Sequence, residues 1–124
     1  MNASVRLVEQ ALEHLKEQNY DSFLSLLAAD AVIGVNDDLP KQQAPDELRM
    51  LLADEQVLKY RVDGVISRGA VQVTMRVQKR SRIVGKGWVR SVFWVRDGGI
   101  ERAQLGQLLV VGQAFVAHAR WWPF

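Results

Sequence analysis

The chain has 124 residues, of which 48% are hydrophobic, and a formal net charge of +2 at pH 7, which fits one globular domain over residues 1–124. It contains no cysteine, which excludes disulfides, thiolate metal sites and cysteine nucleophiles. No apolar run approaches the roughly 18 residues that span a membrane, and residues 1–10 lack a secretory signal pattern, so we expect a cytoplasmic protein.

The first half of the chain predicts three helices and one short strand. Apolar side chains at helical spacing predict an amphipathic helix over residues 4–18, with Glu9 and Glu13 on the side opposite to the apolar stripe. A shorter helix over 21–28 and a strand over 31–35 follow, and a third helix covers 46–53. We expect the starts of these helices to be set by Asn2 or Ser4, by Asp21 and by Pro45.

From Val57 onward apolar and polar residues alternate, which is typical of half-buried strands. Alternation predicts strands over 57–63, 71–78, 86–96 and 100–109, and Asp97-Gly98-Gly99 predicts a tight hairpin between the last two. Helices followed by an antiparallel meander indicate an α+β fold in which the helices cover one face of a sheet.

The stretch NYDSFLSLLAADAVI, residues 19–33, follows the first helix. It resembles the entry signature of the nuclear transport factor 2-like superfamily, which includes ketosteroid isomerases, SnoaL-like polyketide cyclases and limonene epoxide hydrolases. The element order over residues 4–109 resembles this group as well. The resemblance implies an α+β cone, in which the helices and the concave face of a strongly curved, mainly antiparallel sheet enclose a pocket.

The catalytic groups of the steroid isomerases do not carry over to this chain. Their first-strand acid corresponds to Val35, their second acid to Ser91, and their helix-one tyrosine to Ala11. We therefore do not expect that isomerase reaction. The two histidines, His14 and His118, lie far apart without clustered carboxylates, so we expect no metal site. We also expect no cofactor.

Strand parity predicts a concave face that is mostly apolar with few polar groups, the usual makeup of a small-molecule pocket. The residues expected to contact a ligand are Val35, Tyr60, Val73, Met75, Ser91, Phe93 and Leu105. The same parity places Leu58 and Glu101 on this face. The alternative is a plain core in which these side chains pack on the helices.

Asp37 is the candidate general base. A carboxylate beside apolar walls has its pKa raised by desolvation, toward the range in which proton transfer is useful near neutral pH. The alternative is a turn acid in the sequence VNDDLP that accepts hydrogen bonds from nearby backbone.

The opposite, convex face carries two indoles, Trp88 and Trp94, with Val92 between them. Exposed indoles on a sheet usually mark an interface, and many relatives in the resembling family dimerise through this face. We expect a homodimer with these three residues near its centre and Arg76 and Arg90 toward its rim.

Charge is unevenly divided along the chain. Residues 1–56 contain eleven acidic and four basic residues, whereas residues 57–124 contain three acidic and twelve basic ones. We expect binding of a small, mostly apolar molecule in the cone, with acid–base catalysis of an isomerase, cyclase or epoxide-hydrolase kind left open. The alternative is a protein-interaction or polyanion-binding module that uses the basic sheet face. We expect no membrane contact and do not expect nucleic acid as a partner.

Overall fold

The computed structural model describes residues 2–35, 39–79 and 86–109. The described residues begin with two helices and a strand, α1 (Ala3–Lys16), α2 (Tyr20–Ser25) and β1 (Leu27–Val35). A third helix and four strands follow, α3 (Pro45–Asp54), β2 (Glu55–Ser67), β3 (Ala70–Lys79), β4 (Lys86–Arg96) and β5 (Gly99–Leu109). The predicted α+β order of helices and strands is confirmed.

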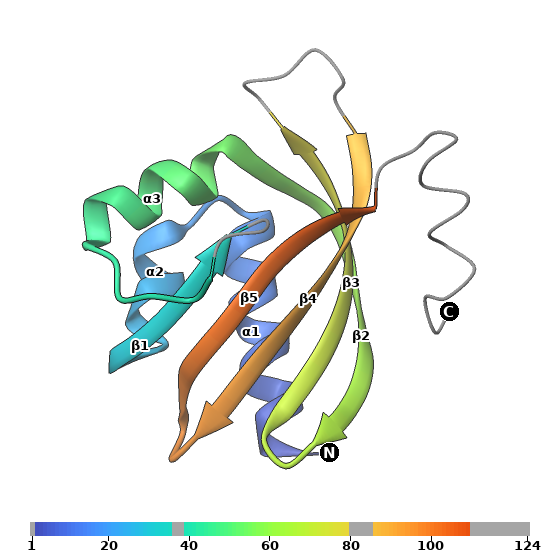
Figure 1. Ribbon diagram of the computed structural model, residues 1–124. Helices are drawn as coiled ribbons and strands as arrows, with labels where there is room; N and C mark the ends of the chain where they lie inside the picture. Colours follow the sequence, from blue (N-terminus) through green and yellow to red (C-terminus); the bar gives the residue numbers. More distant parts are fainter. Residues whose placement is uncertain (1, 36–38, 80–85, 110–124) are drawn as a thin grey trace.

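The strands form one sheet in the order β1-β5-β4-β3-β2. Strands β2 to β5 make the predicted antiparallel meander, and β1 adds to its edge by pairing parallel with β5. Figure 1 shows the sheet curving around α1, with α2 and α3 on the same side. The helices therefore cover the concave face, and the convex face carries no helix of the described residues.

Capping interactions at both ends of α1 determine where the helix begins and ends. The Asn2 side chain accepts hydrogen bonds from the backbone N–H of Ser4 at 2.7 Å and of Val5 at 3.4 Å, so Asn2 is the N-cap. At the other end Gln18 adopts a positive φ of 61°, and the N–H of Asn19 donates to the carbonyl of His14 at 2.8 Å, as in a Schellman motif.

The start of α2 differs from the prediction. Asn19, and not Asp21, is its N-cap, because the Asn19 side chain accepts a hydrogen bond from the N–H of Ser22 at 3.3 Å. The helix therefore begins earlier and ends at Ser25, and β1 already starts at Leu27. Both Asn19 and Asp21 have side chains that can cap a helix, and the prediction of Asp21 was wrong.

Register shifts change which residues are buried. Between β2 and β3 the register shifts at Val57/Lys59, and Val57 becomes buried at 4% exposure, which simple alternation did not predict. The prediction that Glu101 lines the concave face is wrong, because Ile100 and Ala103 are the buried residues there. The Glu101 carboxylate instead forms an ion pair with Arg96 at 2.8 Å.

The turn between β2 and β3 lies against the end of β4. Gly69 has a positive φ of 73°, and a side-chain Cβ at this position would sit 2.7 Å from the carbonyl oxygen of Val95. The N–H of Val95 donates to the carbonyl of Gly69 at 2.8 Å. The predicted β4–β5 hairpin is also confirmed, with positive φ at Asp97 and Gly98.

Two glycine substitutions separate backbone strain from close packing. We expect Gly98→Ala to lower the free energy of unfolding by about 1–2 kcal/mol, because its φ of 78° disfavours an L side chain but its surroundings are open. Gly69→Ala should cost a further 1–3 kcal/mol, approximately, because the methyl group also overlaps the Val95 carbonyl. Urea denaturation measures both. Equal losses would show that the turn shifts to accommodate the methyl group.

Candidate functional site

The structure brings the predicted lining residues together on the concave face. Six of them are at most 3% exposed: Val35, Val73, Met75, Ser91, Phe93 and Leu105. The seventh, Tyr60, is half-buried and packs against the same core. The seven come from all five strands, and they face a helix layer in which Val8, Ala11 and Leu12 of α1 are fully buried. The concave face is therefore one continuous apolar surface around α1.

The three positions that correspond to the steroid isomerase catalytic groups lie in this core. Ala11 is 0%, Val35 is 3% and Ser91 is 1% exposed. None of these side chains carries a carboxylate or a phenol, so the concave face has no proton-transfer group at the positions that the resemblance indicates.

The Ser91 hydroxyl has a structural partner. It accepts a hydrogen bond from the backbone N–H of Gly106 at 2.9 Å. The β4–β5 register shifts between Arg90 and Val92, and Gly106 has a positive φ of 73°, so this N–H belongs to an irregular part of the ladder. The hydroxyl satisfies a buried donor that the sheet leaves unpaired.

Tyr60 has a specific polar partner on α1. Its hydroxyl donates to the Glu13 carboxylate at 2.6 Å. Burial, this hydrogen bond and the negative charges of Glu13, Glu9 and Glu17 raise the pKa of Tyr60 to about 12. Tyr60 is therefore a neutral hydrogen-bond donor near neutral pH and does not act as a base.

Glu13 was missed in the sequence, which assigned it only to the side of the helix away from the apolar stripe. The available signal was the repeat of glutamates at positions 9, 13 and 17, which line one side of a helix. The pairing of this side of α1 with Tyr60 depends on how α1 crosses β2, and helical periodicity does not contain that information.

The candidate base Asp37 and His118 lie outside the described residues. His14 is half-buried on α1, and its Nδ1 is buried without a hydrogen-bond partner among the described residues. Within the described ranges no three histidine, aspartate or glutamate side chains are grouped so that they could hold a metal ion. The helices of the same ranges include none long and apolar enough to cross a membrane.

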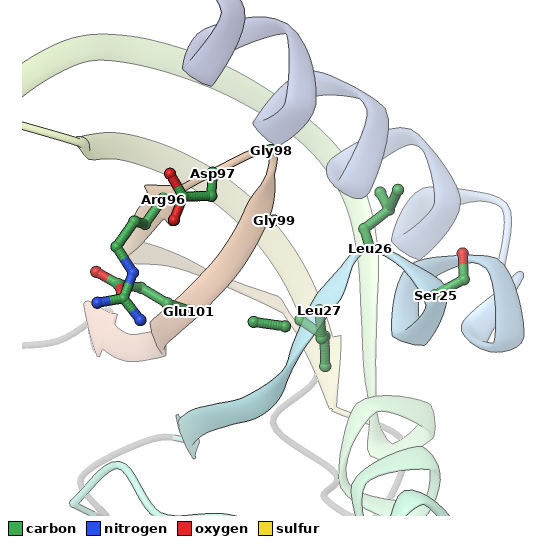
Figure 2. A pocket seen from close by; sticks show the side chains of 9 residues that line it. Ser25, Leu26, Leu27, Arg96, Asp97, Gly98, Gly99 and Glu101 are labelled. Atoms are coloured by element: carbon green, nitrogen blue, oxygen red, sulfur yellow. The ribbon is translucent and has the colours of Figure 1, made fainter.

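Two surface pockets flank the β4–β5 turn, and the sequence did not predict them. One, of about 300 Å³, lies between residues 25–28 and the segment 96–101. Figure 2 shows the Arg96 and Glu101 side chains together on its hairpin side and Leu26 and Leu27 across from them. The other, of about 350 Å³, lies between the first part of α1 and residues 95–98. Both are open and mixed in polarity, unlike the apolar concave face.

No protein-family model matches the chain, and no curated protein matches it. Solved structures do. A proposed polyketide cyclase from Xanthomonas campestris is 19% identical with a TM-score of 0.65, covering 82% of this chain and 87% of that one. An LEH-like epoxide hydrolase from M. tuberculosis is 22% identical with a TM-score of 0.59, covering 82% and 80%.

An NTF2-like protein from Burkholderia pseudomallei is 15% identical with a TM-score of 0.61, covering 84% of this chain and 89% of that one. The predicted likeness to the nuclear transport factor 2-like proteins is thus confirmed at the level of the fold. At these identities the likeness concerns the fold alone, because one fold can carry many unrelated functions.

The Tyr60–Glu13 pair makes stability depend on alkaline pH. The unfolded chain releases the phenol proton near pH 10, whereas folded Tyr60 holds it to about pH 12. The contribution of Tyr60 to the free energy of unfolding should therefore be constant below about pH 10 and should be lost as the pH rises from about 10 to about 12. Urea denaturation of Tyr60→Phe across this range should lack that part of the fall, and Glu13→Gln should reduce it. An identical decline in Tyr60→Phe would contradict the assignment.

Proposed function

We propose that this domain binds a small, mostly apolar molecule at the concave face of the cone. The observation that carries the proposal is the convergence of apolar side chains from all five strands on one surface beside α1, with one polar pair next to it. Such a surface with few polar groups is typical of ligand pockets. Proteins of the same fold include ones described as polyketide cyclases and as an epoxide hydrolase, names that refer to small organic compounds.

In this proposal Val35, Val73, Met75, Phe93 and Leu105 supply the apolar contacts. The Tyr60 hydroxyl and the Glu13 carboxylate supply the polar one, because a ligand hydroxyl or carbonyl can exchange hydrogen bonds with this pair. The Ser91 oxygen already accepts the Gly106 N–H, so Ser91 contributes to a ligand site through its hydroxyl hydrogen.

Catalysis is a separate step of the proposal. Asp37 follows β1 by two residues and remains the candidate general base for an isomerase, cyclase or epoxide-hydrolase type of reaction. If it has this role, Asp37→Asn removes turnover of a bound compound and leaves its binding intact.

We further propose that the chain forms a homodimer through Trp88, Val92 and Trp94. Trp88 is 38% exposed, an unusual exposure for a large indole. The surrounding arginines oppose the contact, because two positive faces repel. Raised salt screens this repulsion and should therefore strengthen the dimer.

Ligand binding can be tested by thermal unfolding. Apolar compounds of steroid or monoterpene size should raise the Tm by several degrees at concentrations well above Kd. Met75→Trp should abolish this shift, because Met75 is 3% exposed on the concave face and the larger side chain takes up the volume that the proposed ligand needs. Met50→Trp is the matched control, since Met50 is 75% exposed on α3. Binding at the concave face is contradicted if no compound in a diverse panel shifts the Tm, or if both variants lose the shift.

The dimer can be tested by sedimentation at tens of micromolar protein, approximately the range in which moderate interfaces assemble. Wild type should sediment as a dimer, more completely at high salt, and Trp88→Ser with Trp94→Ser should sediment as a monomer. A monomeric wild type at every salt concentration would rule out this interface.

A further inference from the structure

One of the two surface pockets, the one beside the start of β1, arises where the pairing of β1 with β5 is interrupted. Leu27 lies opposite Ile100, and the next paired residues are Val32 and Arg102. Several residues of β1 therefore stand against Glu101 alone on β5, and this wide bulge separates the two backbones. The resulting space of about 300 Å³ is at the lower end of the range for small-molecule sites. We call it the bulge pocket, and it is lined by residues 25–28, 96–99 and Glu101.

The charged side chains that line the bulge pocket carry both signs. They are Arg96, Asp97 and Glu101. Nε of Arg96 donates to the Glu101 carboxylate at 2.8 Å, and Figure 2 shows these two side chains together on the hairpin side of the pocket. The Arg96 side chain is 63% and the Glu101 side chain 31% exposed, so a molecule in the pocket can reach both. An ion pair this accessible to water contributes little stability, and a ligand can therefore share or replace it.

Each of these charged groups has hydrogen-bonding capacity that the described contacts do not use. The ion pair occupies only Nε of Arg96, so the two terminal nitrogens of the guanidinium keep their N–H donors, which match a carboxylate in geometry. Glu101 accepts through one of its two oxygens. Asp97 forms no ion pair with any of the described residues. The hairpin side of the pocket therefore offers donors and acceptors of opposite charge side by side.

The opposite side of the bulge pocket is apolar. Leu26, Leu27 and Ala28 line it, and Figure 2 shows Leu26 and Leu27 across from the charged pair. Both leucines are partly buried and pack against the core, so they form a fixed wall. A molecule that fits this pocket has a charged end toward the hairpin and an apolar part toward β1.

We propose that the bulge pocket binds a free α-amino acid with an apolar side chain. The carboxylate of the amino acid pairs with the terminal nitrogens of Arg96, and its ammonium group pairs with the carboxylates of Asp97 and Glu101. The side chain of the amino acid packs against Leu26 and Leu27. This site is separate from the concave face and does not depend on ligand binding there.

The spacing of the charges favours an α-amino acid over other charged molecules. Because Arg96 and Glu101 are in contact, a matching ligand must carry its own opposite charges equally close together. An α-amino acid carries them on one carbon atom. A simple anion is repelled by two carboxylates, and a simple cation leaves the terminal nitrogens of Arg96 without an acceptor. Only a zwitterion gains an interaction with both signs of charge in this pocket.

The test is an NMR titration of the isotope-labelled full chain with L-leucine. The amide signals of residues 26–28 and 96–101 should shift and saturate with a Kd of about 0.1–1 mM, as expected for a ligand of few atoms in an open pocket. Isoamylamine lacks the carboxylate of leucine, and isocaproate lacks its ammonium group. Each should bind at least about tenfold more weakly than leucine, because one set of charge-assisted hydrogen bonds is lost.

Two substitutions assign the two charges of the ligand. Arg96→Gln should weaken leucine binding at least about tenfold and should not weaken the binding of isoamylamine. Asp97→Asn should weaken leucine binding at least about fivefold and should not weaken that of isocaproate. Asparagine also suits this position of a tight turn, so the hairpin is retained. The controls, Lys16→Gln and Glu47→Gln, remove the same charges from exposed positions on α1 and α3 and should leave all three affinities nearly unchanged.

Several results would overturn the proposal. One is the lack of saturable shifts up to about 10 mM leucine. Another is a set of saturable shifts around Met75 and Phe93, since leucine would then occupy the concave face. Equal affinity for leucine and either analogue would exclude recognition of a zwitterion, and equal weakening by the control variants would indicate a general effect of charge. The two sites report through different amide signals, so the failure of one proposal can be distinguished from the failure of the other.

Discussion

The structure depends on the contact between α1 and the concave face of the sheet. Val8, Ala11 and Leu12 are fully buried on the helix, and Phe93 is fully buried on the sheet. Burying a side chain of this size contributes about 1.5–3 kcal/mol. A single helix can contact β2, β3 and β5 together only if the sheet curves around it, so the register shifts that bend β2 and β5 are part of the same requirement. The close approach of Gly69 to Val95 joins the edge hairpin to this curved surface.

The contact between α1 and the sheet also determines where apolar and charged side chains lie. The concave face must be apolar to pack against α1. The polar residues that alternate with the apolar ones along each strand therefore point to the convex face, and most of the charged residues among them are arginines. Most of the described carboxylates of the first half lie on α1, α2 and α3, on the other side of the sheet. The proposed ligand site and the proposed dimer interface therefore lie on opposite faces, and substitutions such as Met75→Trp and Trp88→Ser can test them independently.

The sequence predicted the elements well because their signals are periodic and local. Apolar spacing indicated α1, alternation indicated the meander, and Asp97-Gly98 indicated the last hairpin. It predicted the apolar lining for the same reason. It failed where one extra residue breaks the alternation, as at Glu101, and where a partner comes from a distant element, as with Glu13 and Tyr60. A β-bulge and the crossing angle of a helix are set by tertiary packing, and local sequence patterns do not predict either of them.

The two hydrogen bonds on the concave side differ in how much free energy it costs to break them. The hydrogen bond from Gly106 to Ser91 satisfies a fully buried donor, and breaking it without replacement leaves that donor unpaired at a cost of about 1–3 kcal/mol. The bond from Tyr60 to Glu13 joins half-buried groups, which water can also reach. If the proposed ligand binds in the cone, it displaces the second bond more easily than the first. Under the same proposal, selectivity for a polar substituent should arise beside α1 at Tyr60, and the buried side chains of Phe93 and Val73 should select only for apolar shape.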